Sequence, residues 1–382
     1  MKKLDHYIER LESIITGKSN LEPLYSFKDF PVFMGCVDTP EEEDIVANMD
    51  WLICPESGLI QLKNLIPEEV LYLNQHNDGT GQIWQNLYRE FGRFIKEHTP
   101  GKSILEIGGA HDWVAKNYWE FGGEASWLIV EPNPEYIKNP KIKVIRAWFD
   151  EHFKTQDHID TVVHSHVLEH TYNPQLFLKQ IHDFLKIGDF HLFAFPNMFP
   201  MLEKKFTNCL NFEHTLFLTE YFTDYLLKIT GFEIVAKEYY GDPHSIFYAT
   251  KKINPPENPP FLENQYRLYK KTFLDFVSYH TDIVEELNKK ISLAQELVYL
   301  FGAHIFSQYL IQFGLSKEKI VSVLDNSSIK QGKRLYGTNL VVESPKTLRG
   351  KGKVIVILKA GIYNEEIKKD ILENINPEVA FW

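Results

Sequence analysis

The order of apolar and polar positions between residues 83 and 196 predicts strands that alternate with helices. In IWQNLYREFGRFIK (83–96), large apolar side chains recur every three or four residues, as on one face of a helix. The segment 174–186 has the same period. Apolar runs predict five buried strands, at 103–108, 127–131, 142–147, 161–166 and 190–196. Strands and helices in this order imply a parallel sheet covered on both faces.

A second series of strands and helices follows a proline-rich break. INPPENPPFLEN (253–264) contains four prolines, which neither continue a helix nor join a central strand. A long charged helix is predicted from about 261 to 293. Beyond it we expect strands at 296–303, 320–325, 353–358 and 379–382, with helices over 304–315 and from Asn364. This pattern predicts a second α/β domain of about 90 residues.

Residues 1–80 show no clear period and indicate a helix mixed with short strands. Charged residues interrupt the N-terminal stretch MKKLDHYIERLESII throughout, which favours an amphipathic helix over a secretion signal. A chain of 382 residues is too long for one ordinary core. We therefore expect three domains, at 1–82, 83–252 and 253–382.

Composition narrows the class of protein. No run of 18 apolar residues occurs, so no membrane span is expected. Cys36, Cys54 and Cys209 have unrelated spacings, which favours the reducing cytoplasm over a disulfide framework. The net charge of −11 argues against nucleic acid as a partner. The sequence does not indicate an oligomeric state.

One local stretch runs against the acidic background. Between 330 and 353 the only acidic residue is Glu343, and seven residues are basic, namely Lys330, Lys333, Arg334, Lys346, Arg349, Lys351 and Lys353. A solvated face explains this composition, and so does attraction for a small anionic ligand. By composition alone the solvated face is favoured.

The first candidate site is SILEIGGAHDW (103–113), where a predicted strand ends in small residues before a helix. Gly108, Gly109 and Ala110 would let a ligand approach the backbone and the N–H donors of the helix. A dinucleotide fingerprint requires G-x-G-x-x-G, which this turn lacks. Glu106 would repel a pyrophosphate but orient an ammonium group. These residues therefore favour S-adenosylmethionine as the cofactor.

The next strand supplies a second acidic group. Glu131 ends WLIVE, where a carboxylate can accept both hydroxyls of a ribose. The alternative is that Glu131 only caps the turn at Pro132. Asp150, after the third strand, is better explained as an exposed loop acid than as a ligand of the adenine edge.

The fourth strand leads into DTVVHSHVLEHTYNP (160–174), which contains the H-x-x-E-H pattern of certain zinc proteases. That chemistry requires both histidines on one helical turn and a third ligand downstream. Here the pattern follows a buried strand, and Asn173-Pro174 would soon end a helix, so coincidence is favoured. We expect Ser165 and His166 to line the cofactor pocket, and His164 and His170 to be packing residues.

At this point a resemblance extends over nearly the whole chain. Residues 160–190 resemble the strand-four signature of class I methyltransferases. The C-terminal stretch 301–348 is similar to that of the three-domain S-adenosylmethionine-dependent sugar C-methyltransferases, which act on nucleotide-linked deoxysugars. The matching positions are Gly302, Ala303, Asp325, Lys330, Gln331, Gly332, Lys333, Gly337, Thr338, Ser344 and Pro345, with Tyr336 in place of a proline.

The resemblance also implies catalytic residues. NFEHTLFLTEYF (211–222) is similar to the family's Y-D-E-H-x-x-x-F run, in which the histidine is the general base. His214 is then the candidate base and Glu213 the residue that orients it, since imidazole titrates near neutral pH. Asn211 stands where the family has a tyrosine. Without the resemblance, a packed histidine would be the favoured explanation.

The family's N-terminal domain binds zinc through two C-x-x-C pairs. WLICPESGLIQL (51–62) resembles the second pair, but Ser57 stands at its second cysteine and only Cys54 remains. The first pair has no evident counterpart. One thiolate cannot build a tetrahedral zinc site, so we expect no metal.

Together these features predict an α/β protein in three parts. A Rossmann-like, doubly wound class I methyltransferase domain would lie between a small N-terminal domain and a C-terminal Rossmann-like domain. The expected substrate is a nucleotide-activated sugar, bound partly by Lys330, Lys333, Arg334 and Gly302, in capsule, lipopolysaccharide or other glycan biosynthesis. Oxygen is favoured as the methyl acceptor, carbon is the alternative, and a non-catalytic binding module with this fold is a more distant one.

Overall fold

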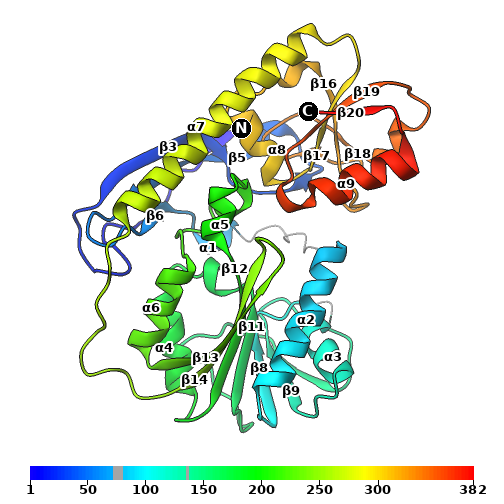
Figure 1. Ribbon diagram of the computed structural model, residues 1–382. Helices are drawn as coiled ribbons and strands as arrows, with labels where there is room; N and C mark the ends of the chain where they lie inside the picture. The colour runs from blue at the N-terminus through cyan, green and yellow to red at the C-terminus, as the bar shows by residue number, and fades with distance from the viewer. Residues whose placement is uncertain (72–80, 135–136) are drawn as a thin grey trace. The chain divides into compact units, whose positions relative to one another are not determined.

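The computed structural model describes residues 1–71, 81–134 and 137–382 and divides into two compact units (Figure 1). The middle unit comprises Asp78–Phe199 and Leu218–Glu263. The terminal unit comprises Met1–Asn77, Pro200–Phe217 and Asn264–Trp382. Within the described ranges, every helix is too short or too polar to cross a membrane.

The middle unit contains a seven-stranded sheet in the order β10-β9-β8-β11-β12-β14-β13. The first five strands in this order are parallel. They confirm the five predicted strands, as β8 (Ser103–Ile107), β9 (Ser126–Val130), β10 (Ile142–Ile145), β11 (Thr161–Ser165) and β12 (Phe190–Pro196). The order reverses between β8 and β11, which is where ligands bind in open sheets of this kind.

Helices cover both faces of this sheet (Figure 1). On one face lie α2 (Gln82–His98) and α3 (Trp113–Glu120), and on the other α4 (Pro174–Phe184) and α6 (Glu220–Thr230). The apolar stripe of α2 is buried, including Leu87 and Phe91. Gly92 permits close packing of α2 on α3, because a Cβ there would lie 2.7 Å from Cβ of Asn117.

The far edge of the sheet is an antiparallel hairpin. β13 (Phe232–Tyr240) pairs with β14 (Ser245–Lys252), and β14 lies antiparallel to β12. The sequence analysis did not identify these two strands. The hairpin brings the segment before β14 to the same end of the sheet as the carboxyl ends of β11 and β8.

The terminal unit contains a five-stranded parallel sheet in the order β18-β16-β15-β19-β20. The predicted strands are present as β15 (Val298–Phe301), β16 (Ile320–Leu324), β19 (Val354–Leu358) and β20 (Val379–Phe381), and β18 (Val342–Glu343) was not predicted. The predicted helices are α7 (Tyr266–Leu293), α8 (Ile305–Gln312) and α9 (Asn364–Asp370). The second α/β pattern is therefore confirmed.

The expected amphipathic helix over the first fifteen residues is wrong. Lys2–Lys3 forms β1, which pairs with β5 (Ile45–Ile53), and Ile8–Glu9 forms β2, which pairs with β7 (Asn64–Leu65). β5 also pairs with β3 (Glu22–Pro31) and β6 (Ile60–Leu62). Pairing with distant strands outweighs the weak local helical period.

The two ends of the chain share one aromatic core. Phe27 of β3 contacts the rings of Tyr309 and Phe313 at centroid separations of 5.2 and 5.5 Å. Tyr25 lies 6.4 Å from Phe273 of α7. Edge-to-face contacts of this kind stabilise a core beyond the area that they bury. Segments assigned from the sequence to the first and third domains thus fold together.

The segment 200–217 joins the terminal unit although the middle unit precedes and follows it in the chain. Phe217 N donates to Ile60 O at 2.8 Å, and Leu62 N donates to Thr215 O at 2.9 Å. The buried Tyr309 hydroxyl donates to Leu210 O at 2.8 Å. These bonds fix the segment that carries Asn211, Glu213 and His214.

Candidate cofactor and catalytic site

The turn after β8 brings the backbone close to neighbouring side chains of the same unit. Gly108 adopts φ 73°, and its N–H donates to Val130 O at 3.0 Å. A Cβ on Gly108 would lie 2.7 Å from Cγ2 of Val167, and one on Gly109 would lie 2.8 Å from Cδ of Glu106. Any larger residue at either position would collide with these side chains.

Glu106 is the buried acid of this turn. Its side chain is 3 % exposed, and Oε2 accepts a hydrogen bond of 2.7 Å from the indole of Trp127. Burial raises the pKa of Glu106 to about 8, and the negative charges of Asp112 and Glu131 add to the rise, while the Trp127 hydrogen bond opposes it. A cation bound here would favour the ionised form.

Glu131 lies at the end of the neighbouring strand β9. Its Oε1 accepts from the backbone N–H of Asn133 at 2.8 Å, which is the turn cap that the sequence left open as an alternative. A carboxylate has several acceptor positions, so this cap leaves room for a ribose hydroxyl. Asp150 lies in a turn, where its Oδ1 accepts from His152 N at 2.8 Å.

The end of β11 contributes a hydrogen-bonded pair of polar residues. His166 has φ 55°, a left-handed conformation that is uncommon outside glycine and is often found at functional sites. Its Nδ1 lies 3.1 Å from Oγ of Ser165, and its Nε2 lies 3.0 Å from Oγ of Ser245. The imidazole is therefore held at the carboxyl end of β11, beside the point between β8 and β11 where the strand order reverses.

Three further residues at this end of the sheet were not identified as site residues from the sequence. Ser245 is fully buried, and its Oγ lies 2.7 Å from Nδ1 of His244, whose pKa burial lowers to about 4. Trp84 of α2 packs edge-on against His166 and His244, at centroid separations of 4.9 and 5.1 Å. Trp84 lies far along the chain from the adjacent His244 and Ser245, and no local motif links it to them.

The structure brings the predicted cofactor residues together at one end of the sheet. Glu106 lies near the end of β8 and Gly108 and Gly109 follow that strand, Glu131 follows β9, and Ser165 ends β11 just before His166. Ala110 continues the turn, and its N–H donates to Gly108 O at 3.1 Å. An open pocket beside α3 is lined by Tyr88, Arg89, Trp113 and Asn117, together with Gln82, Gln85 and Asn86.

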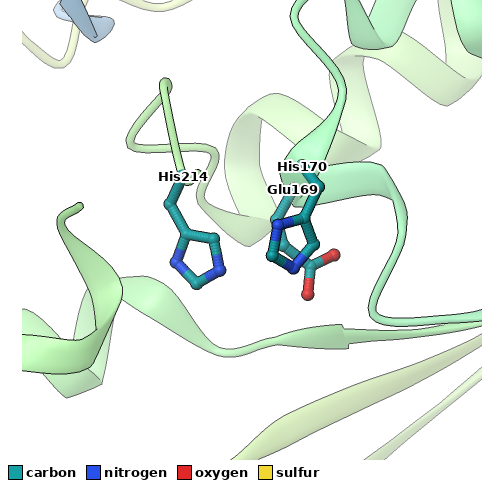
Figure 2. Close-up of side chains that lie close together, drawn as sticks. All are labelled: Glu169, His170 and His214. Atoms are coloured by element: carbon teal, nitrogen blue, oxygen red, sulfur yellow. The ribbon is translucent and has the colours of Figure 1, made fainter. Parts of the chain in front are cut away.

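The H-x-x-E-H pattern does not have the geometry of a zinc protease. Glu169 and His170 lie in the short 3₁₀ helix η2 (Leu168–His170), and His166 precedes it in a left-handed turn. Figure 2 shows the side chains of Glu169 and His170 on this segment. Both ring nitrogens of His166 contact serine hydroxyls.

The candidate catalytic residues lie in a short turn within 200–217. Oδ1 of Asn211 accepts from the backbone N–H of Glu213 and of His214, at 2.8 Å each. Glu213 is 5 % exposed, and the side chain of His214 is partly buried. Asn211 thus positions the backbone that carries the other two.

The basic stretch of the terminal unit is partly paired. Arg334 makes two bonds of 2.6 Å to the carboxylate of Asp44, which is 0 % exposed. Its Nε also donates to Thr39 O, so most of the guanidinium is used within the unit. Lys330 Nζ lies 3.3 Å from Oδ2 of Asp325, and the Lys333 ammonium lies 4.0 Å from Asp38.

Gly302 ends β15 with φ 101°, in a strand–turn–helix connection. Asp325 follows the neighbouring strand β16, and its Oδ2 accepts from Ala303 N at 2.9 Å. The turn and the acid therefore lie at the carboxyl end of this second parallel sheet, as a ligand site in a doubly wound fold would.

Comparison with known proteins matches the middle unit. Residues 82–237 match a family model described as a methyltransferase domain. No curated protein sequence matches the chain.

Solved structures resemble less than half of the chain at low identity. A 1,6-didemethyltoxoflavin-N1-methyltransferase of Burkholderia thailandensis is 13 % identical over 45 % of this chain and 82 % of its own, with TM-score 0.35. The N-methyltransferase NodS of Bradyrhizobium japonicum is 12 % identical over 45 % and 89 %, with TM-score 0.34. Human N-acetylserotonin methyltransferase is 15 % identical over 45 % and 54 %, with TM-score 0.38.

The strand order, with its antiparallel β14, is that of a class I methyltransferase fold. The middle unit therefore has a class I methyltransferase fold, and the matched range 82–237 includes most of it.

Proposed function

We propose that the protein transfers a methyl group from S-adenosylmethionine to a nucleotide-activated sugar. The observation that carries the donor assignment is the turn at Gly108 and Gly109, where either Cβ would collide with a neighbour. When bound, S-adenosylmethionine supplies an electrophilic methyl group on a sulfonium centre. The chain supplies a backbone that a ligand can approach and a carboxyl, Glu106, that can balance positive charge.

The remaining cofactor contacts are proposed at the same carboxyl end of the parallel strands. Glu131 is proposed to accept the ribose hydroxyls, because it ends the strand next to the glycine turn. Ser165 and His166 are proposed to lie against the methionine portion. The hydrogen bonds of His166 to two serines would keep its ring fixed while the ligand binds. Much of the rate would then come from alignment of the reacting groups.

His214 is proposed as the general base. A sugar hydroxyl, or a C–H next to a carbonyl, must lose a proton before it attacks a methyl group, and an imidazole can accept that proton near neutral pH. The assignment rests on the resemblance to the sugar methyltransferases. Asn211 supports it indirectly, because its two bonds to the backbone of Glu213 and His214 fix the turn.

The nucleotide sugar is proposed from the terminal unit. Gly302 and Lys330 lie at the carboxyl end of its parallel sheet, and Lys333 lies in the same basic stretch. Arg334 is a weaker candidate than the sequence suggested, because Asp44 already holds its guanidinium. Pathways that build capsule, lipopolysaccharide or other glycans use substrates of this class.

Oxygen is proposed as the acceptor in preference to carbon. The carbon-methylating family has a tyrosine where this chain has Asn211. The Asn211 carboxamide caps the following turn, a local role that needs a short polar side chain and that a phenol cannot perform. Carbon methylation of a nucleotide-linked keto-deoxysugar remains the second candidate, because the C-terminal resemblance is long.

A methyl-transfer assay with purified protein tests the proposal. Keto and reduced nucleotide sugars are supplied with methyl-labelled S-adenosylmethionine, and NMR locates the methyl group. A methyl ether supports the proposal, whereas a methyl on carbon selects the second candidate. Failure to bind S-adenosylmethionine in calorimetry would instead favour a non-catalytic module. Binding without transfer to any nucleotide sugar would refute the substrate class alone.

A further inference from the structure

A tight turn near the N-terminus is closed by two backbone hydrogen bonds. Gly17 N donates to Ser13 O, and Ser13 N donates to Lys18 O, both at 2.8 Å. Gly17 has φ 67°, which glycine adopts without strain. Within the turn, Thr16 N donates to Oγ of Ser13 at 3.3 Å. The turn thus has hydroxyl side chains at its first and fourth positions, Ser13 and Thr16, and glycine at its fifth.

A second turn, forty-one residues later, repeats the backbone hydrogen bonds, the hydroxyl residue at the fourth position and the glycine at the fifth. Gly58 N donates to Cys54 O at 2.8 Å, and Cys54 N donates to Leu59 O at 2.9 Å. Gly58 has φ 83°. Ser57 occupies the fourth position. The two turns therefore share their spacing, their hydrogen bonds and their left-handed glycine.

The two turns contact one another through their first and fourth side chains. Oγ1 of Thr16 lies 3.6 Å from Sγ of Cys54. Cys54 and Ser57 are fully buried, and Ser13 is 1 % exposed. Burial would raise the pKa of the Cys54 thiol, but hydrogen bonds from Ser57, Thr16 and the backbone hold it below its usual value. The thiol therefore lies among donors contributed by both turns.

Gln61 holds the first turn beside the strand that follows the second. Its Oε1 accepts from Ile14 N at 3.2 Å, and its Nε2 donates to Glu12 O at 2.9 Å. The contact between Thr16 and Cys54 is thus supported by backbone bonds on one side. It is part of the fold of the terminal unit rather than a chance approach of two loops.

Paired turns that face one another with cysteines at their first and fourth positions form tetrahedral zinc sites in zinc ribbons. The donor set here is one thiol and three hydroxyls. Zinc in proteins takes thiolate, imidazole or carboxylate ligands, so Ser13, Thr16 and Ser57 do not fit the metal. The zinc implied by the family resemblance is therefore incompatible with the side chains at these positions.

We propose that the two turns are a zinc-ribbon knuckle pair in which Ser13, Thr16 and Ser57 replace three ligands and hydrogen bonds to Cys54 join the turns in place of a metal. This assigns a counterpart to the first cysteine pair, which the sequence alone did not reveal. Neutral hydroxyls avoid the repulsion that four uncompensated thiolates would create in a buried cluster. The N-terminal fold then keeps its shape at any zinc concentration.

The decisive experiment restores the missing ligands in the full chain. The triple variant S13C/T16C/S57C, which retains Cys54, is expected to bind about one zinc ion per chain. Cobalt(II) reports the geometry, because tetrahedral thiolate coordination gives intense visible absorption bands. Zinc should raise the melting temperature of the variant and leave that of the wild type unchanged. The matched control adds C54S, which removes one ligand and should weaken binding.

Three results would overturn the proposal. The first is stoichiometric, chelator-removable zinc in the wild type, and the second is a folded triple variant without the cobalt bands. Should the triple variant fail to fold, T16C alone gives the third test, since its new thiol replaces a hydroxyl in contact with Cys54. Mild oxidation should link it to Cys54 and not to Cys36 or Cys209, as read by peptide mass. A folded T16C variant without that link would refute the pairing of the turns.

Discussion

The indole of Trp127 on β9 donates a hydrogen bond of 2.7 Å to Glu106 on the neighbouring strand β8. In the register of these strands Trp127 lies opposite Ile104, so the bond runs diagonally on the face that α2 and α3 cover. It orients a buried carboxyl whose pKa is raised to about 8. Glu106 is therefore close to its point of ionisation at physiological pH and will respond to a nearby cation.

Binding of S-adenosylmethionine is expected to release protons from Glu106. With a pKa of about 8 in the free protein, the carboxyl is mostly protonated at pH 7, and a bound cation lowers that pKa. Affinity should therefore increase as the pH rises through about 8 and level off above it. Calorimetry in two buffers of different ionisation enthalpy measures the proton count.

Glu106→Gln is the matched control for this titration, because it keeps the shape and removes the proton. The amino group of the ligand titrates in both proteins, so the difference between them belongs to Glu106. Equal proton release from the variant and the wild type would show that Glu106 does not sense the ligand.

Alanine at the glycine turn is expected to abolish cofactor binding. In Gly108→Ala the new Cβ meets Val167 at 2.7 Å, in a left-handed backbone that costs about 1–2 kcal/mol. Gly122→Ala is the control, since Gly122 has φ 78° but no neighbour within 4 Å of a Cβ. Both should lose stability in thermal melts, Gly108→Ala more because of the contact with Val167, and only Gly108→Ala should lose affinity. Equal affinity in both would place the ligand elsewhere.

His214→Asn is expected to lower kcat by about 10²–10⁴ while the Kd of S-adenosylmethionine stays nearly unchanged. An amide cannot accept the proton of the sugar. Asn211→Asp is the matched control, because its carboxylate still accepts from the backbone N–H of Glu213 and His214. A His214→Asn variant with wild-type turnover would exclude His214 as the base.

Acid should destabilise the protein through two buried histidines. Nε2 of His164 and Nε2 of His191 lie 3.0 Å apart, and both side chains are fully buried. Burial lowers the pKa of both, that of His191 to about 3, so the unfolded chain binds more protons below about pH 6.5. Unfolding free energy should therefore fall as the pH drops, by up to about 1.4 kcal/mol per pH unit for each histidine.

Replacing both histidines by phenylalanine should flatten this acid limb in denaturant titrations at pH 4–7. The flanking Phe193 already stacks on both rings, at 5.0 and 4.9 Å, which suits an aromatic replacement. His152→Phe is the control, because the His152 side chain is 84 % exposed. An unchanged acid limb in the double variant would assign it to other groups.

The parallel strands of both sheets, except β18, could be predicted because each is a short apolar run next to a turn. The runs at 103–108 and 127–131 needed no knowledge of distant contacts, and neither did the glycine turn between them. The local pattern of apolar runs and turns therefore placed Glu106, Gly108 and Glu131 at the carboxyl end of the predicted parallel strands. The hairpin β13–β14 escaped detection, because the exposed Val235 interrupts the alternation of apolar and polar residues that marks a half-buried strand.

Contacts between distant residues decided the features that the sequence could not show. The first fifteen residues have a weak helical period, yet Lys2 pairs with Ile45 and Ile8 with Leu65. Arg334 seemed free for an anionic ligand, but Asp44 holds it from 290 positions away. Trp84 contacts His244, the neighbour of Ser245, only in the folded middle unit.

Because residues 200–217 belong to the terminal unit, neither unit is one continuous stretch of the chain. The backbone passes from one unit to the other four times, so no single truncation yields either unit with an uninterrupted chain. A gene fragment for 78–263 would encode Thr215 and Phe217 without the β6 segment to which they bond. Residues 200–217 would therefore have to be replaced by a linker before the middle unit could be produced alone.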